Sequence, residues 1–93
     1  MANDIVTTRL QILNEKGLHA RAAAKFVELV DKFDVSLIVK KDNLEACGDS
    51  IMGLLMLAAS KGTEIELVAS GTEAAETLLA LSDLVENLFG EEM

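Results

Sequence analysis

Residues 5–33 read IVTTRLQILNEKGLHARAAAKFVELVDKF, and the hydrophobic period changes once within this stretch. From Ile5 to Leu13 apolar and polar residues alternate, which is typical of a half-buried β-strand. Residues 14–17 interrupt the alternation and indicate a loop. From Ala20 to about Phe33 charged residues recur every three or four positions opposite an apolar stripe, so we predict an amphipathic helix.

Three more stretches alternate in the same way as the first strand. We predict strands over residues 34–40, 44–48 and 64–70. The pair Asp42-Asn43 is typical of a tight turn and would join the first two of them. Four strands of this kind, each with one apolar face, favour a mainly antiparallel sheet that is covered on one side.

Two further helices complete the predicted fold. One extends over residues 50–60, with Ser50 as its N-cap and Lys61-Gly62 at its end. The other begins after Thr72, which we predict as its cap, and stops at Gly90. The order βαββαβα predicts an α+β fold, a two-layer open-faced sandwich with three helices on one face of a four-stranded sheet.

The composition is typical of one small globular domain. The chain has 93 residues, of which 51% are hydrophobic and 3% aromatic, so we expect a single domain over residues 1–93 with an aliphatic core. The formal net charge of −8 argues against nucleic-acid and anionic-membrane partners and favours a monomer. We interpret residues 90–93 as a short frayed tail.

Other features argue against secretion, membrane insertion and a metal site. Cys47 is the only cysteine, which excludes a disulfide within the chain, and we interpret it as a small packing residue. The N-terminus lacks the segments of a signal peptide, and the uncharged run 50–60 is too short to span a bilayer. We therefore predict a cytoplasmic protein without a metal or a cofactor.

His19 is the only histidine and lies just before the first predicted helix. There its side chain is close to unpaired backbone N–H groups and the positive end of the helix dipole, which favour a phosphate and a neutral, nucleophilic imidazole. Arg21 is placed to donate a fork of hydrogen bonds to phosphate oxygens. From the residues alone two interpretations stay open: a phosphoryl acceptor, or a histidine that caps the helix beside a solvated arginine.

Ser50 also has two interpretations. Its hydroxyl is placed to cap the second helix, and it is a candidate for phosphorylation because a helix N-terminus tolerates a phosphate. The predicted helix over residues 50–60 has no charged residue, so it has more apolar side chains than one buried face needs. We expect part of this apolar surface to be exposed and to bind a partner; its large side chains are Ile51, Met52, Leu55 and Met56.

Two motifs resemble those of the HPr family, the histidine-containing phosphocarriers of the phosphoenolpyruvate-dependent phosphotransferase system. Gly-Leu-His-Ala-Arg at residues 17–21, which opens a helix, resembles the active-site segment of the family. Ser-Ile-Met-Gly at residues 50–53, continuing to Lys-Gly-Thr-Glu-Ile at 61–65, resembles the second signature. The resemblance covers nearly the whole chain in register, and it favours the phosphoryl-acceptor interpretation of His19.

The resemblance implies a carrier that is a substrate of enzymes and not itself an enzyme. Enzyme I, charged from phosphoenolpyruvate, would pass a phosphoryl group to Nδ1 of His19 with the help of Arg21, and His19 would pass it to a IIA-type protein. Ser50 matches the serine modified by an ATP-dependent HPr kinase/phosphorylase, and charge added there would oppose the histidine reaction. The family's partner-binding surface matches Ala20, Ile51, Met52 and Leu55.

One position departs from the family's pattern. Ala22 stands where proline is usual at the first turn of the helix; alanine is also compatible with a helix, so we expect function to be retained. The departure favours a proteobacterial type, including the nitrogen-related branch. The alternative function is a mainly regulatory module that docks according to its phosphorylation state and does not serve sugar uptake.

Overall fold

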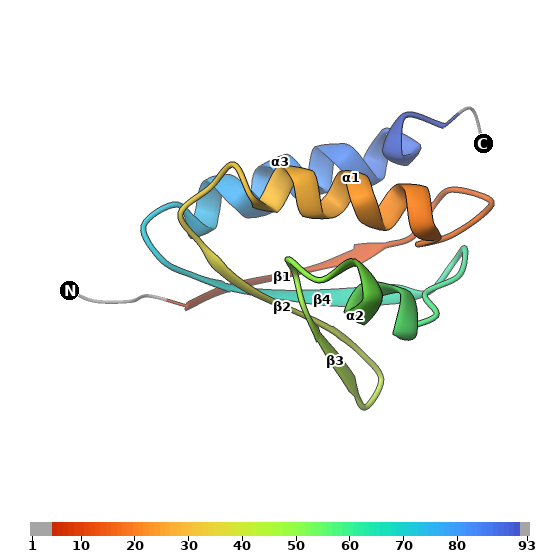
Figure 1. Cartoon of the computed structure of the whole chain (residues 1–93), viewed down its shortest axis with the longest axis horizontal. Helices are drawn as coiled ribbons and strands as arrows, with labels where there is room; N and C mark the ends of the chain where they lie inside the picture. Colours follow the sequence, from red (N-terminus) through yellow and green to blue (C-terminus); the bar gives the residue numbers. More distant parts are fainter. Residues whose placement is uncertain (1–4, 92–93) are drawn as a thin grey trace.

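The computed structural model describes residues 5–91, and its elements follow the predicted order βαββαβα (Figure 1). The strands are β1 (Ile5–Gln11), β2 (Ser36–Lys41), β3 (Leu44–Cys47) and β4 (Glu64–Ser70). The helices are α1 (Ala20–Val30), α2 (Ile51–Met56) and α3 (Ala74–Glu86), followed by the short turn η1 (Leu88–Gly90). Within residues 5–91, no helix has both the length and the apolar character needed to cross a membrane.

The four strands form one antiparallel sheet in the order β1-β4-β2-β3. The central strand β4 pairs with β1 along its whole length and with β2 on its other side. β2 and β3 form a hairpin in which Lys41 pairs with Leu44 across the predicted turn at Asp42-Asn43. The predicted antiparallel sheet is confirmed, and its central pairings join segments that are far apart in the sequence.

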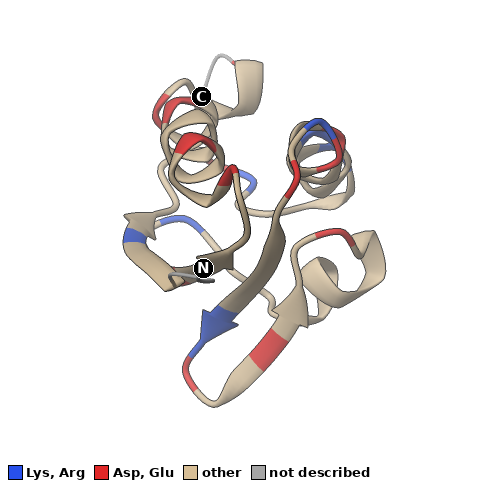
Figure 2. Cartoon of the chain, turned by 90° about the vertical axis from the view of Figure 1, so that its left-hand side faces the viewer, with Lys and Arg blue, Asp and Glu red and all other residues tan. Residues whose placement is uncertain are grey.

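The alternation in the strands places one face of the sheet against the helices. Along β4, Ile65, Leu67 and Ala69 are buried, as predicted, and the residues between them are more exposed. α1 and α3 lie side by side over this face (Figures 1 and 2). The rings of Phe26 and Phe89 are fully buried in the layer between helices and sheet. The two-layer α+β sandwich is therefore confirmed.

α1 ends at Val30 and not at Phe33 as predicted. The backbone N–H groups of Lys32 and Phe33 bond to carbonyls three residues back, both at 3.1 Å, so this last turn is wound more tightly than an α-helix. β2 accordingly begins at Ser36 and not at residue 34. The spacing of charges continues unchanged through the turn, so the sequence pattern does not mark the helix end.

α2 is shorter than predicted: it ends at Met56, not at Ser60, and Lys61-Gly62 does not terminate it. Ala58 takes a left-handed backbone conformation with φ of 54°. The carbonyl of Ala59 then accepts a hydrogen bond from the Leu18 N–H at 2.8 Å. This long-range bond takes the chain out of the helix, and no local signal in the sequence indicates it.

α3 is not capped by Thr72, whose hydroxyl donates to Asp34 Oδ2 at 2.8 Å instead. Glu73 occupies the N-cap position, and its carboxylate accepts the backbone N–H of Asp34 at 2.6 Å. Both side chains therefore connect the start of α3 to the segment before β2. At its other end α3 stops before η1, where Phe89 is fully buried and Leu88 only half-buried.

Cys47 lies at the end of β3, the strand at one edge of the sheet. Its side chain is exposed, so its interpretation as a packing residue is wrong. Successive side chains of a strand point to opposite faces of the sheet. The preceding residue, Ala46, is buried against the helices, so Cys47 lies on the other, exposed face.

Candidate functional site

The loop between β1 and α1 fixes the position of His19. The Leu18 N–H bonds to the Ala59 carbonyl, which attaches this loop to the segment after α2. Gly17 has φ of 66°, and a Cβ added to it would lie 2.5 Å from the Ala59 carbonyl oxygen. Only glycine fits both this backbone conformation and this close approach. Gly17 therefore allows the contact that places His19 at the helix start.

His19 is the N-cap residue of α1, with extended backbone (φ −84°, ψ −176°). Its carbonyl accepts the first helical hydrogen bond, from Ala23 N–H at 2.8 Å, so the helix begins without proline at Ala22. The side chain makes no capping hydrogen bond, so the interpretation of the imidazole as a cap is wrong. Its Nε2 contacts a carboxylate oxygen of Glu91 instead. The side chain of His19 is 27% exposed, which leaves the ring accessible to a partner.

Glu91 reaches His19 because α3 runs back along α1 and ends beside the start of α1, so the residues after α3 lie at that end of the molecule (Figure 1). Its second carboxylate oxygen accepts a hydrogen bond from Nδ2 of the fully buried Asn14 at 2.9 Å. The bond from Asn14 and then the bond with His19 hold the pKa of Glu91 below its usual range, so this carboxylate stays ionised at neutral pH. The predicted frayed tail is therefore wrong for Gly90 and Glu91; residues 92–93 lie outside the described part of the chain.

A shallow hollow of about 160 Å³ lies beside His19. It is lined by Lys16, Leu18, His19, Ala58, Ala59 and Ser60. Lys16 was not predicted as a site residue, although its place in the loop before the histidine is a usable signal. Arg21 is exposed on the first turn of α1 and forms no ion pair with any residue from 5 to 91. Lys16 therefore lies on the rim of the hollow, and Arg21 lies on the adjoining helical turn. An anion in the hollow would have both cations nearby.

The two longest helices differ in charge (Figure 2). α3 contains three carboxylates and neither lysine nor arginine, whereas α1 contains Arg21 and Lys25 and one carboxylate, Glu28. The positive charge of the helical layer is thus concentrated on the helix that begins at His19. This distribution favours an anionic group at that end of α1 over one along α3.

Ser50 caps α2 as predicted, because its Oγ accepts the backbone N–H of Gly53 at 3.0 Å. The expected exposed apolar surface is also confirmed: Ile51, Met52 and Met56 are 39%, 69% and 75% exposed. Leu55 is half-buried, and Ala20 is exposed on α1. The structure brings the segment that follows α2 next to His19; Ser50 lies at the opposite end of α2 and does not line the hollow.

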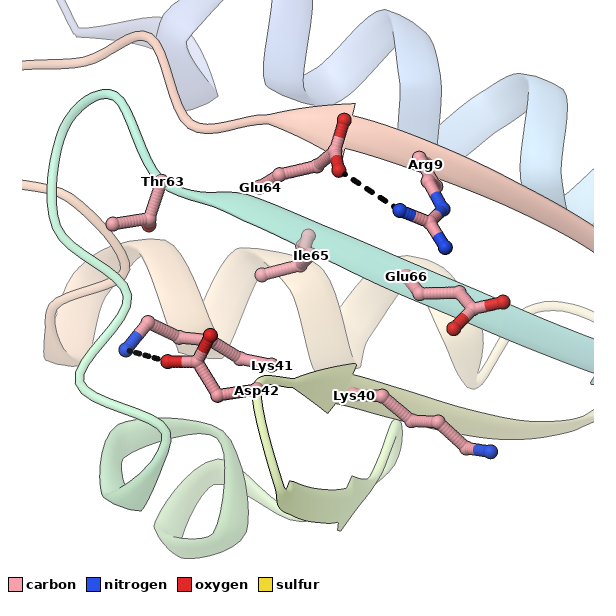
Figure 3. A pocket seen from close by; sticks show the side chains of 8 residues that line it. All are labelled: Arg9, Lys40, Lys41, Asp42, Thr63, Glu64, Ile65 and Glu66. Atoms are coloured by element: carbon pink, nitrogen blue, oxygen red, sulfur yellow. Dashed lines mark hydrogen bonds and ion pairs between the residues drawn. The ribbon is translucent and has the colours of Figure 1, made fainter.

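A larger hollow, of about 480 Å³, lies where β1 and β4 approach the β2–β3 turn (Figure 3). Arg9 pairs with Glu64 at 3.2 Å, and Lys41 pairs with Asp42 at 3.5 Å. Within each pair the opposite charges neutralise each other. The residues that line this hollow include no histidine, cysteine or serine. Among residues 5–91 no three histidine, cysteine or acidic side chains gather as metal ligands. The hollow beside His19 therefore remains the candidate site.

Comparison with known proteins points to one family. A family profile described as PTS HPr component phosphorylation site matches residues 6–87. The phosphocarrier protein HPr of Neisseria meningitidis serogroup A is 48% identical over 82 residues, which are 88% of this chain and 92% of the relative. The phosphocarrier protein NPr of Escherichia coli is 38% identical over 88 residues, 94% of this chain and 98% of the relative. A crystal structure of HPr from Thermoanaerobacter tengcongensis matches with a TM-score of 0.90 and 42% identity, over 95% of this chain and 99% of that chain.

The hydrogen bond from Gly53 to Ser50 gives a prediction about stability. Replacing Ser50 with alanine leaves that N–H without its acceptor, so we expect the free energy of unfolding to fall by about 0.5–2 kcal/mol. Asparagine at the same position retains an acceptor and should restore most of the loss. Urea denaturation followed by circular dichroism measures both effects. Equal stability of Ser50→Ala and the unmodified protein would contradict the role of Ser50 as a cap.

Proposed function

Because this chain belongs to the HPr family of phosphocarriers, we propose that His19 is the residue that carries the phosphoryl group. The chain is a phosphocarrier of the phosphotransferase system and not an enzyme. The observation that supports His19 is its place at the start of α1, beside a hollow that Lys16 also lines. Besides the nucleophile, phosphoryl transfer needs positioning and charge stabilisation, and this arrangement supplies both.

We infer that Nδ1 of His19 is the accepting atom. Nε2 contacts Glu91, whereas Nδ1 forms no hydrogen bond with any residue from 5 to 91 and is free to bond to phosphorus in the tautomer that has its hydrogen on Nε2. Enzyme I is the proposed donor and a histidine on a IIA-type protein the proposed acceptor. The guanidinium of Arg21 lies on the first turn of α1 and is available to bind phosphoryl oxygens during both transfers.

We propose that partners dock on the apolar surface next to the site. The exposed side chains of α2 and the exposed Ala20 are on the two helices whose ends meet near His19. Their apolar area is of the kind that marks protein interfaces, and the methionines adapt to several partner shapes. The proposed docking surface consists of Ala20, Ile51, Met52 and Leu55, and the exposure of Met56 adds that residue to it.

We propose that Ser50 is a regulatory phosphorylation site for an HPr kinase/phosphorylase. Its hydroxyl begins the helix that carries the proposed docking surface. A phosphate there would add charge to an interface that is mainly apolar and would oppose binding of enzyme I. Ser50 was predicted at the start of a helix over residues 50–60, but α2 has only six residues, so this proposal depends on the position of Ser50 beside the docking surface.

Domain organisation, oligomeric state and location are properties of the whole chain. We propose that residues 1–93 act as one carrier domain and as a single copy, which the net charge of −8 supports. The lone Cys47 supports the cytoplasmic location. A mainly regulatory, nitrogen-type role has less support, because the identity to Escherichia coli NPr is 38% and that to the Neisseria HPr is 48%.

The role of His19 is tested by phosphorylation with purified enzyme I and phosphoenolpyruvate. We expect the unmodified protein to gain one acid-labile phosphoryl group, seen by mass spectrometry, and His19→Ala to gain none because the nucleophile is absent. Circular dichroism checks that the variant is folded. Absence of labelling on the unmodified protein, with an enzyme I that labels its own carrier, would contradict the proposed function.

The role of Arg21 is tested by the rate of that transfer. Arg21→Ala removes the donors to the phosphoryl oxygens, and we expect the rate from phospho-enzyme I to fall about 10-fold to 100-fold. Lysine keeps the charge but not the fork of donors and should give an intermediate rate. The matched control is Arg9→Ala, because Arg9 is an exposed arginine at the larger hollow, which His19 does not line. Equal rates for the Arg21 and Arg9 variants would exclude a role of Arg21 in transfer.

The regulatory proposal is tested with ATP and an HPr kinase/phosphorylase. Ser50→Ala should lose the label and Ser60→Ala, an exposed serine after α2, should keep it. The form phosphorylated on Ser50 should accept a phosphoryl group from enzyme I more slowly, because like charges oppose each other in the interface. Labelling that survives in Ser50→Ala would show that the modified residue is another one.

A further inference from the structure

The turn that precedes Glu91 has an unusual backbone. Leu88, Phe89 and Gly90 have φ of 58°, 54° and 79°, all in the left-handed region that side chains other than glycine rarely adopt. The buried ring of Phe89 holds this turn in place, and the Phe89 carbonyl accepts a hydrogen bond from Lys25 Nζ at 2.6 Å. Directly after this turn, Glu91 lies against the start of α1 and contacts His19.

The side chain of Glu91 is then held on both of its oxygens. Asn14 is fully buried and donates through Nδ2 both to the Gly17 carbonyl at 2.8 Å and to Glu91 Oε1 at 2.9 Å. Glu91 Oε2 contacts Nε2 of His19. The side chain of Glu91 is only 16% exposed, so this carboxylate is more enclosed than the other acidic groups that form ion pairs in residues 5–91. The contact between Glu91 and His19 is therefore held in place by the surrounding structure, unlike an ion pair between two exposed side chains.

An ionised carboxylate can only accept hydrogen bonds, so the nitrogen in contact with it must carry a hydrogen. In a neutral imidazole one nitrogen carries the hydrogen and the other has the lone pair. We propose that Glu91 is a positioning residue for phosphoryl transfer, which keeps the proton of His19 on Nε2 and thereby keeps Nδ1 as the nucleophile. This inference rests on the proposed function of His19 and adds to it a residue from the other end of the chain.

The proposal also accounts for the proton in both transfers. The lone pair of Nδ1 forms the bond to phosphorus while the bond from phosphorus to the donor breaks, and Nε2 keeps its proton. The ring becomes a phosphoimidazolium cation, which the negative charge of Glu91 stabilises. On transfer to the acceptor the bond between phosphorus and Nδ1 breaks, its electron pair returns to Nδ1, and a neutral ring is left. Glu91 therefore acts on the histidine, whereas Arg21 acts on the phosphoryl oxygens.

Glu91→Gln is a sharp test because a glutamine has one acceptor oxygen and one NH₂ group. In the unmodified protein each carboxylate oxygen faces a different partner, so a glutamine in the same place presents its NH₂ either to the Asn14 Nδ2 donor or to Nε2 of His19. The second arrangement favours the hydrogen on Nδ1. Glu76→Gln is the matched control, since it makes the same charge change at an exposed position at the start of α3.

The first measurement is the tautomer of His19 in the protein alone, from long-range ¹H–¹⁵N correlations of the ring nitrogens at neutral pH. We expect the hydrogen on Nε2 in the unmodified protein and in Glu76→Gln. In Glu91→Gln the ratio of the two tautomers should shift toward Nδ1–H by about 10-fold to 100-fold, as for the loss of one charge-assisted hydrogen bond. An unchanged tautomer ratio in folded Glu91→Gln would overturn the proposal.

The second measurement is the rate of phosphoryl transfer from phospho-enzyme I. We expect kcat for Glu91→Gln to fall about tenfold, while KM for the carrier stays near that of the unmodified protein because Glu91 is outside the docking surface. If Glu91 had only a structural role, Glu91→Gln would lower the thermal stability but would not lower kcat at an unchanged KM. Glu91→Asp keeps the charge with a shorter reach and should recover part of the rate.

The outcomes separate this inference from the proposed function. If the unmodified protein is not labelled on His19, the carrier role of His19 fails while the tautomer measurement still reports on Glu91. If the unmodified protein is labelled and Glu91→Gln has the same tautomer and the same kcat, His19 remains the acceptor and the role of Glu91 is refuted.

Discussion

The antiparallel pairing of β1 with β4 is the interaction on which the site depends. It joins residues 5–11 to residues 64–70, and its hydrogen bonds continue beyond the strands, where Ile12 exchanges bonds with Thr63 and Gly62 at 2.8 and 2.7 Å. The two loops at this end of the sheet are thereby held together, and the bond between Leu18 and Ala59 follows from that alignment. The start of α1 is positioned by a part of the chain that is distant in the sequence.

The site at that end is built from small contributions of several segments. The β1–α1 loop supplies Lys16 and the histidine, the segment after α2 supplies one wall of the hollow, and the residue after η1, Glu91, supplies the carboxylate that contacts the ring. Only a few groups are needed, because a carrier has to bind a phosphoryl group strongly enough to accept it and weakly enough to release it. With Glu91 on Nε2, Lys16 at the same hollow and Arg21 on the next helical turn, the proposed nucleophile His19 fits this reversible chemistry, because charge is stabilised on the ring and on the phosphoryl group.

The imidazole of His19 is accessible to a partner, and the residues behind it are buried and hold it in place. His19 lies partly exposed next to an apolar surface that a partner can cover, and the groups behind it are buried: Gly17 allows the close contact with Ala59, and Asn14 is enclosed by the loop and the tail. A ring held in this way needs little rearrangement when a partner docks. Such a pre-formed site suits a domain of 93 residues, whose small core leaves little free energy of folding to order a mobile site.

The sequence by itself determined which residues alternate and which recur at the helical period, and therefore the order of elements, the buried face of β4 and the cap at Ser50. It also singled out His19 and Arg21 as candidate residues, because both belong to one local motif at a helix start. Only the tertiary structure decided where α2 ends, which partner Thr72 binds and that Glu91 meets His19. Periodicity encodes the face that a residue presents to the core, whereas these features depend on hydrogen bonds and packing between segments that are distant in the chain.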